Sequence, residues 1–131
     1  MPFEAKHRFA RISPRKARLI VDLVRGRDVD DAISILKFAK QRASVMVEKI
    51  IRSAVANSTE QSAAPTRNTL YVATARVDPG PIIKRFQPKD RGKAYPINKR
   101  TSHIVVTIDE RGEGEVAPKQ NLVGRRPGKA R

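Results

Sequence analysis

The chain has 131 residues, no cysteine and a formal net charge of +15, from 28 Lys and Arg against 13 Asp and Glu. This length suits one domain with an appendage, and the missing thiols exclude disulfides and thiolate metal sites. An excess of like charge opposes folding but releases counterions beside a polyanion, so nucleic acid is the favoured partner and an anionic membrane surface the alternative.

The first predicted elements are a strand and a helix. Residues 3–9 alternate between apolar and charged, which predicts a strand with Phe3, Ala5, His7 and Phe9 on its apolar face. A helix then opens at Ser13-Pro14, because the serine hydroxyl can accept from free amides and proline suits the first helical position. Gly26 marks its end. The core face of this helix is expected to hold Ala17, Ile20, Val21 and Val24.

Two further helices follow. The shorter one is expected to begin at Asp30, and helix-start chemistry explains the acids Asp28, Asp30 and Asp31 more simply than a metal site does. Its expected core residues are Ile33, Leu36 and Phe38. The longer helix is predicted over about 41–57, from an apolar stripe at helical spacing. That stripe comprises Ala43, Met46, Val47, Ile50, Ile51, Ala54 and Val55.

The remaining chain predicts a loop, two strands and a tail. Residues 58–68 are small and polar and are expected to form the loop. Residues 69–78 form a strand whose buried face stays open, because Leu70 and Val72 compete with Tyr71 and Val77 for the interior. Residues 103–109 alternate cleanly and predict another strand. Residues 111–131 are low in apolar content and are expected to be a basic, disordered tail.

Between these strands lies a strongly basic segment, 84–103, which holds seven Lys or Arg and one acid. Gly92 marks a turn near its midpoint, which predicts a long hairpin arm over about 79–101. Four prolines there suit a two-stranded arm rather than a central sheet. Counted from Val77 to Asp109, each limb has about 16 residues, so the hairpin would reach about 50 Å from root to tip at roughly 3.3 Å per residue.

This arm has little apolar surface to offset the entropy of its own ordering. The contacts that offset this entropy cost must therefore come from a binding partner, and the cations indicate that the partner carries phosphates. Folded RNA, with its irregular crevices, suits an extended arm best. A DNA-bending protein with Phe86 and Pro88 as wedge residues is the alternative, and a flexible solvated loop without a partner is the less favoured interpretation.

Catalytic and metal chemistry find no support in the sequence. The two histidines, His7 and His103, lie on separate strands without matched Cys or acidic clusters. There is no phosphate-cradling glycine loop, and no Ser–His–acid set can be nominated. Aromatic residues make up only 5% of the chain, so base stacking is not expected to be the main binding mode. We expect no enzyme activity, no metal and no cofactor.

Three stretches together form a specific pattern: AKHRFARISPRKARLIVDLVRG at 5–26, VDPGPIIKRFQPKDRGKAYPI at 77–97 and KRTSHIVV at 99–106. They closely resemble the ribosomal protein L22 (uL22) family of the bacterial type, over about residues 3–110. The resemblance implies an α+β fold, with three helices packed on a small antiparallel sheet and a long extended β-hairpin arm. It also implies one domain over residues 1–110.

The resemblance further implies a non-enzymatic, cytoplasmic protein of the large ribosomal subunit. Its partners would be several domains of the ribosomal RNA, neighbouring ribosomal proteins and the nascent polypeptide, and it would assist subunit assembly. By position, the implied RNA-binding residues are Lys6, His7, Arg8, Arg11, Arg15, Lys16, Arg18, Lys84, Arg85, Lys99, Arg100, Thr101, Ser102 and His103. The hairpin tip, which would line the exit tunnel, comprises Lys89, Asp90, Arg91, Gly92 and Lys93.

Overall fold

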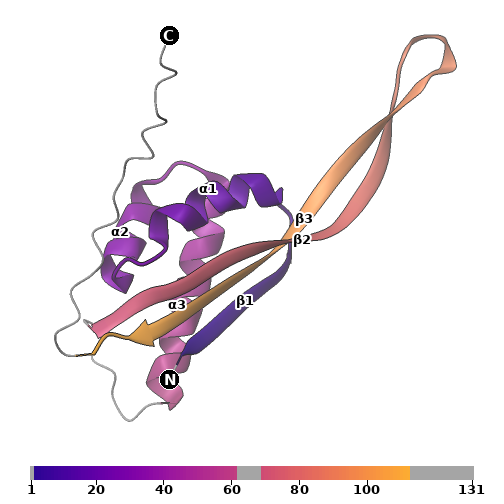
Figure 1. Cartoon of the computed structure of the whole chain (residues 1–131). Coiled ribbons are helices and arrows are strands. Elements are labelled where there is room, and N and C mark those ends of the chain that lie inside the picture. Colours follow the sequence, from indigo (N-terminus) through magenta and orange to yellow (C-terminus); the bar gives the residue numbers. More distant parts are fainter. Residues whose placement is uncertain (1, 62–68, 113–131) are drawn as a thin grey trace, which may run out of the picture.

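The computed structural model describes residues 2–61 and 69–112, and it confirms the α+β architecture. The elements are β1 (Phe3–Ala10), α1 (Pro14–Val24), α2 (Val29–Phe38), α3 (Arg42–Gln61), β2 (Leu70–Pro88), a short 3-10 turn (Asp90–Gly92) and β3 (Ala94–Glu110). The strands form one antiparallel sheet in the order β1-β3-β2, and the three helices lie on one of its faces (Figure 1). Beyond this sheet, β2 and β3 continue together as the arm.

The core lies between the central strand β3 and the helices. Ile104, Val106 and Ile108 are completely buried, as their alternation predicts. The predicted stripe of α1 is also buried, and so is that of α3 except for Met46, which is partly buried against the core. Full burial of one such aliphatic side chain contributes about 1.5–3 kcal/mol, so this layer supplies most of the folding free energy.

The prediction for Phe9 is wrong, because β1 contains a β-bulge. The register runs from His7 opposite Ile104 to Ala10 opposite Ser102, so Arg8 and Phe9 together oppose His103 alone. The extra residue reverses the alternation: Ala10 turns inward and Phe9 is left 55% exposed. Phe9 adopts a φ of 58°, a left-handed conformation that costs an L-residue roughly 1–2 kcal/mol.

A second bulge explains why the buried face of β2 could not be assigned from the sequence. The register shifts between Val72, which pairs with Ile108, and Thr74, which pairs with Thr107. Leu70 and Val72 are therefore buried before the bulge, whereas Ala75 and Val77 are buried after it. Of the residues that competed for the interior, Leu70, Val72 and Val77 face the core on different parts of the strand, whereas Tyr71 is only half-buried.

The second and third helices differ from the prediction in three respects, two of them boundaries and one the exposure of a side chain. α2 begins at Val29 rather than Asp30, and its last residue, Phe38, is 88% exposed rather than part of the core. α3 continues to Gln61, and within this extension Ser58 is buried and donates its hydroxyl to the Val55 carbonyl at 2.7 Å. The first residues of the predicted loop are thus helical, and residues 62–68 lie outside the described part of the chain.

The outer edge of β2 is covered by the chain around the end of α1. Gly26 donates its amide to the Val72 carbonyl, and Val72 donates to the Arg27 carbonyl, both at 2.9 Å. Further along the edge, Arg25 donates to the Ala75 carbonyl at 2.7 Å and Arg18 to the Val77 carbonyl at 3.1 Å. These contacts satisfy an edge that would otherwise pair with another strand.

The arm begins where β2 bends. The register shifts between Pro79 and Ile82, and Gly80 lies so close to β3 that an added Cβ would meet the Thr101 hydroxyl oxygen at 2.5 Å. The Thr101 hydroxyl also donates to the Pro81 carbonyl at 2.6 Å. The root of the arm is therefore tightly packed, which sets the direction in which the limbs leave the sheet (Figure 1).

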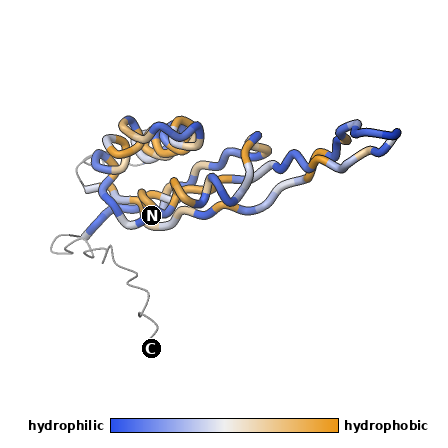
Figure 2. The backbone as a smooth tube through the Cα atoms, turned by 90° about the horizontal axis from the view of Figure 1, so that it is seen from above, coloured by the Kyte–Doolittle hydropathy of each residue, from blue (hydrophilic) through white to orange (hydrophobic). Residues whose placement is uncertain are grey.

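The limbs then pair without interruption from Ile82 opposite Arg100 to Pro88 opposite Ala94. The 3-10 turn closes the tip, with Arg91 and Gly92 both at positive φ. Figure 2 shows hydrophilic residues along the tip of the arm, whereas the helices and the strands beneath them contain many hydrophobic residues. The turn agrees with the predicted tip at residues 89–93.

At the opposite end, Arg111 is attached to the domain. Its amide donates to the Thr69 carbonyl at 2.8 Å, and its guanidinium pairs with Asp28 at 2.9 Å and lies 5.0 Å from the Tyr71 ring centroid. Arg111, the first residue of the predicted tail, is thus held against the domain by these contacts. Most of the predicted tail, residues 113–131, lies outside the described residues.

Candidate nucleic-acid interface

Two groups of cations in the described chain differ in whether they are paired inside the protein. Several form ion pairs: Lys6 with Glu4, Arg25 with Asp22, Arg52 with Glu48, Arg76 with Asp78 and Arg111 with Asp28. Two of these pairs, Lys6–Glu4 and Arg76–Asp78, lie on the sheet face that the helices leave open. Two of the cations on the open face of the sheet are therefore neutralised within the fold.

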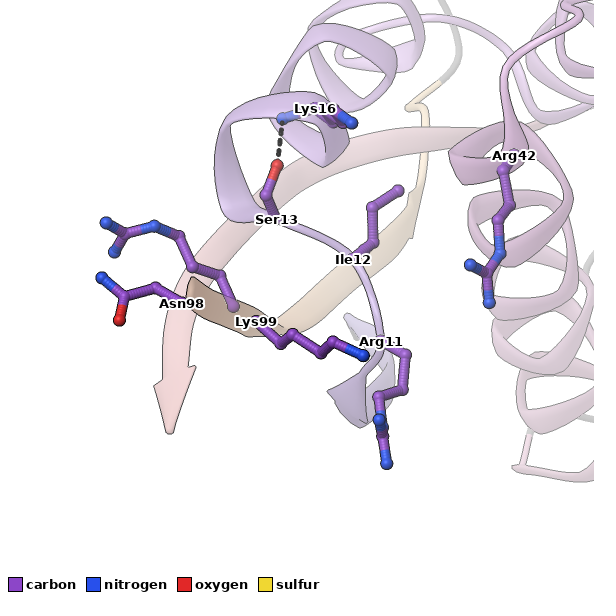
Figure 3. A pocket seen from close by; sticks show the side chains of 8 residues that line it. Arg11, Ile12, Ser13, Lys16, Arg42, Asn98 and Lys99 are labelled. Carbon is purple, nitrogen blue, oxygen red and sulfur yellow. Dashed lines mark hydrogen bonds between the residues drawn. The ribbon is translucent and has the colours of Figure 1, made fainter. Parts of the chain in front are cut away.

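The second group gathers around a pocket of about 700 Å³ at the root of the arm (Figure 3). We call it the arm-root basin. It is lined by Arg11, Ile12, Ser13, Lys16, Arg42, Asn98, Lys99 and Arg100. No acid lines it, and none of its five cations forms an ion pair within residues 2–61 and 69–112.

Separate elements bring these cations together. Arg11 lies in the turn after β1, Lys16 in the first turn of α1, Arg42 at the start of α3, and Lys99 and Arg100 on the β3 limb of the arm. Figure 3 shows Arg42 reaching in from the opposite side of the pocket to the arm residues. Residues far apart in the sequence thus form one positive surface, which only the folded chain creates.

Two helix starts contribute to this positive potential. The first turns of α1 and α3 contain no acid, whereas α2 begins with Asp30 and Asp31. Helix N-termini carry partial positive charge and unsatisfied amides, which acids usually compensate. The Ser13 hydroxyl accepts from one such amide, that of Lys16, at 3.4 Å. The basin therefore adds helix dipoles to its side-chain charges, and an anion is the ligand that it fits.

The arm is basic on both of its faces. In an antiparallel ladder, paired residues share a face and successive residues alternate. Lys84 and Arg100 fall on one face, whereas Arg85 and Lys99 fall on the other. All four side chains are exposed, and so is Phe86, at 71%. A ribbon with cations on both sides is suited to being surrounded by a polyanion rather than laid on one.

The residues that the resemblance implied for RNA binding differ in their positions, and the first set is exposed to solvent. Arg11, Lys16, Lys99 and Arg100 meet in the basin, and Arg8, Arg15, Lys84 and Arg85 are exposed elsewhere. The five tip residues, Lys89 to Lys93, are also exposed, and Lys89 lies 5.6 Å from the Tyr95 ring centroid.

The other implied residues have partners or positions inside the protein. Arg18 binds the Val77 carbonyl and Lys6 pairs with Glu4, although both side chains remain exposed. Thr101 and Ser102 are buried, and His7 is half-buried. His103 accepts the Phe9 amide at its Nδ1, at 2.9 Å. Thr101 and Ser102 therefore support the arm root, and we leave their side chains out of the proposed contact surface.

Sequence reasoning missed two residues that line the basin, Arg42 and Asn98. A signal for Arg42 was present: Lys40 precedes α3, Arg42 begins it, and no acid follows in its first turn. A cation at that place is electrostatically unfavourable for the free helix. Asn98 carries no comparable signal, because its place beside the basin follows only from the strand pairing.

Metal and membrane chemistry find no site in the described residues. Within them, no group of three or more His, Asp or Glu side chains is placed to hold a metal ion. No helix among them is long and apolar enough to cross a membrane.

The fold and the basin define a class: small basic α+β proteins in which a compact domain carries a long cationic hairpin. A family model described as ribosomal protein L22p/L17e matches residues 5–109. Two similar proteins, both named large ribosomal subunit protein uL22, come from Lactobacillus helveticus and Geobacter sulfurreducens. The first is 49% identical over 110 residues, 84% of this chain and 93% of that protein, and the second 49% over 111 residues, 85% and 99%. The chain belongs to this ribosomal protein family, whose members are structural proteins rather than enzymes.

Proposed function

We propose that the chain is a structural, RNA-binding component of the large ribosomal subunit in the cytoplasm, and that the arm-root basin is its principal contact with ribosomal RNA. The relatives named as large-subunit proteins support the location. The observation that carries the RNA contact is the gathering of five cations without a single acid, continuous with an arm that is basic on both faces.

The mechanism is electrostatic and geometric. The basin docks on phosphates of the RNA surface, while the arm enters a crevice in which phosphates surround both of its faces. Each contact releases counterions and relieves the repulsion among the unpaired cations. Base-specific readout is not required, because the shape of the folded RNA selects the site. By bridging RNA segments at the basin and along the arm, the protein assists assembly of the subunit.

Binding to bacterial large-subunit ribosomal RNA, measured at several salt concentrations against duplex DNA of equal length, tests this proposal. If about ten phosphates are contacted, the log–log salt slope is expected to lie near −7 to −9. Preference for duplex DNA would favour a DNA-architectural protein instead, and a flat salt dependence would contradict the electrostatic mechanism. Co-sedimentation with large subunits after a high-salt wash tests the ribosomal location.

The exposed tip, Lys89 to Lys93, is proposed to line the exit tunnel and to meet the nascent polypeptide. The chain has no cysteine, so Arg91→Cys introduces a unique thiol at the tip. In assembled ribosomes with a stalled nascent chain that contains cysteine, this thiol is expected to form a cross-link. Arg52→Cys, on α3, is the matched control and is expected to form none. Equal cross-linking of both would contradict the placement of the tip.

A further inference from the structure

The exposure and the backbone conformation of Phe9 are not explained by the packing of the domain. Its ring is largely exposed although it follows an alternating apolar pattern, and its backbone is in the left-handed region. Bulky residues rarely adopt this conformation, and Gly, Asn or Asp at the same place would hold the bulge with less strain. A strained residue that the surrounding structure holds in place is a candidate for a functional position.

Two neighbours hold the Phe9 ring in one orientation. The bulge leaves the Phe9 amide without a ladder partner, and the His103 Nδ1 accepts it at 2.9 Å. The two rings meet edge to face, with centroids 4.9 Å apart and an interplanar angle of 87°. With Nδ1 accepting, the neutral imidazole carries its proton on Nε2. Contacts between the segments AKHRFAR (residues 5–11) and KRTSHI (residues 99–104) therefore hold the Phe9 ring in one orientation.

The surroundings of the ring are cationic. The Arg8 guanidinium lies over one face of the Phe9 ring, 5.3 Å from its centroid, in a cation–π contact, and Arg11, two residues beyond Phe9, lines the basin. Ala10, between them, pairs with Ser102, which follows the arm residues Lys99 and Arg100. An exposed, oriented aromatic ring thus lies two residues along the chain from Arg11, which lines a site suited to phosphate.

We propose that Phe9 is a stacking platform for one unpaired nucleobase, belonging to the RNA whose backbone occupies the arm-root basin. Phosphate and base are the two parts of a nucleotide, and the basin and the ring offer one surface for each. An aromatic face accepts any base and is sequence-tolerant, and splayed-out bases in folded RNA are the usual targets of such rings. An apolar side chain of a neighbouring protein suits the place less well, because Arg8 and Arg11 would then lose water without gaining a counter-charge.

This inference rests on the proposed function, and salt dependence separates the two. A stacked base releases no counterions, so Phe9→Leu is expected to raise the Kd for transcribed large-subunit RNA about 5- to 150-fold at every salt concentration, with an unchanged slope. Phe9→Tyr, which keeps the ring, is expected to bind within about threefold of the parent. Arg11→Ala is the matched control and is expected to make the slope shallower by about 0.7–0.9. Ultraviolet cross-linking is expected to attach a nucleotide to the peptide that contains Phe9.

A further variant separates binding from folding. Asn tolerates the left-handed backbone, so Phe9→Asn is expected to melt within a few degrees of the parent while binding RNA as weakly as Phe9→Leu. If Phe9→Leu and Phe9→Asn bind RNA as tightly as the parent, the stacking role is wrong and the proposed function stands. If they weaken association only with particles that contain other proteins, Phe9 contacts a protein and the inference is overturned. Failure of the parent protein to prefer this RNA would instead remove the proposed function.

Discussion

In the described residues, cations at one end of the domain are paired within the fold, whereas those at the arm root have no acidic partner. Where Arg111 and Asp28 meet, and where Arg25 binds both Asp22 and the Ala75 carbonyl, positive charge is neutralised within the fold. At the arm root, the five basin cations have no acidic partner among the described residues. The same residue types stabilise the free protein at one end and repel one another at the other.

This contrast shows that net charge alone does not locate a binding surface. The open face of the sheet carries cations too, yet Glu4 and Asp78 balance two of them. What distinguishes the basin is the absence of acids from its lining and from the two helix starts beside it. An anionic partner would supply the missing counter-charge.

The largest expected effect comes from removing the basin charges together. Replacing Arg11, Lys16, Arg42, Lys99 and Arg100 by Ala is expected to make the salt slope shallower by about 3.5–4.5 and to weaken RNA binding about 10³-fold near physiological salt. Filter binding at several salt concentrations measures both quantities. The double variant Arg52→Ala with Arg76→Ala, which removes paired cations, is expected to stay within about threefold of the parent. A loss of affinity in the double variant in proportion to the charge removed, two cations against five on the logarithmic scale, would mean that only total charge matters.

The next effect concerns the arm, whose root is packed and whose tip is free. Gly80→Ala places a Cβ 2.5 Å from the Thr101 hydroxyl and 3.2 Å from the Thr101 backbone carbon, so it is expected to destabilise the fold by about 1–3 kcal/mol. Thermal unfolding followed by circular dichroism measures this as a lower melting temperature.

Gly92→Ala is the comparison at the tip. Its added Cβ would meet nothing within 4 Å, although φ is +68°. The strain of about 1 kcal/mol stays in the turn, so the melting temperature of the domain is expected to remain unchanged. An equal loss in both variants would show that tip and domain unfold as one unit.

A smaller effect is expected where charge and helix dipole meet. Arg42→Asp places an acid in the first turn of α3 and is expected to stabilise the protein by about 0.3–1 kcal/mol while weakening RNA binding. Asp31→Asn, at the start of α2, is the matched control, with a small destabilisation and unchanged binding. Urea unfolding and RNA titration give the two readouts. A variant that gained stability without losing affinity would place Arg42 outside the RNA contact.

The smallest effect is expected from shortening the arm. Residues 86–95 are all exposed, so their deletion removes no side chain from the core. The shortened protein is expected to unfold cooperatively, with a melting temperature within a few degrees of the parent. Loss of cooperative unfolding by calorimetry would show that the arm and the domain depend on each other.

The sequence alone determined those features that depend on local chemistry. Ser13, Pro14 and Gly26 bound the first helix because capping and φ preferences act over a few residues. The apolar periods of α1, α3 and β3 predicted their buried faces, and the charge, prolines and Gly92 predicted a basic hairpin. Each of these signals lies within one continuous segment.

Only the tertiary structure decided the features that depend on register and on contacts between distant segments. The bulges at Phe9 and after Val72 reverse which side chains face inward, and no local pattern reports an extra residue opposite a partner strand. Phe38, the last residue of α2, is exposed rather than packed in the core. The basin joins Arg11, Lys16 and Arg42 to the arm because packing places two helix starts beside one strand. Such proximity is a property of the folded chain, since electrostatic potential depends on distance in space rather than on separation in sequence.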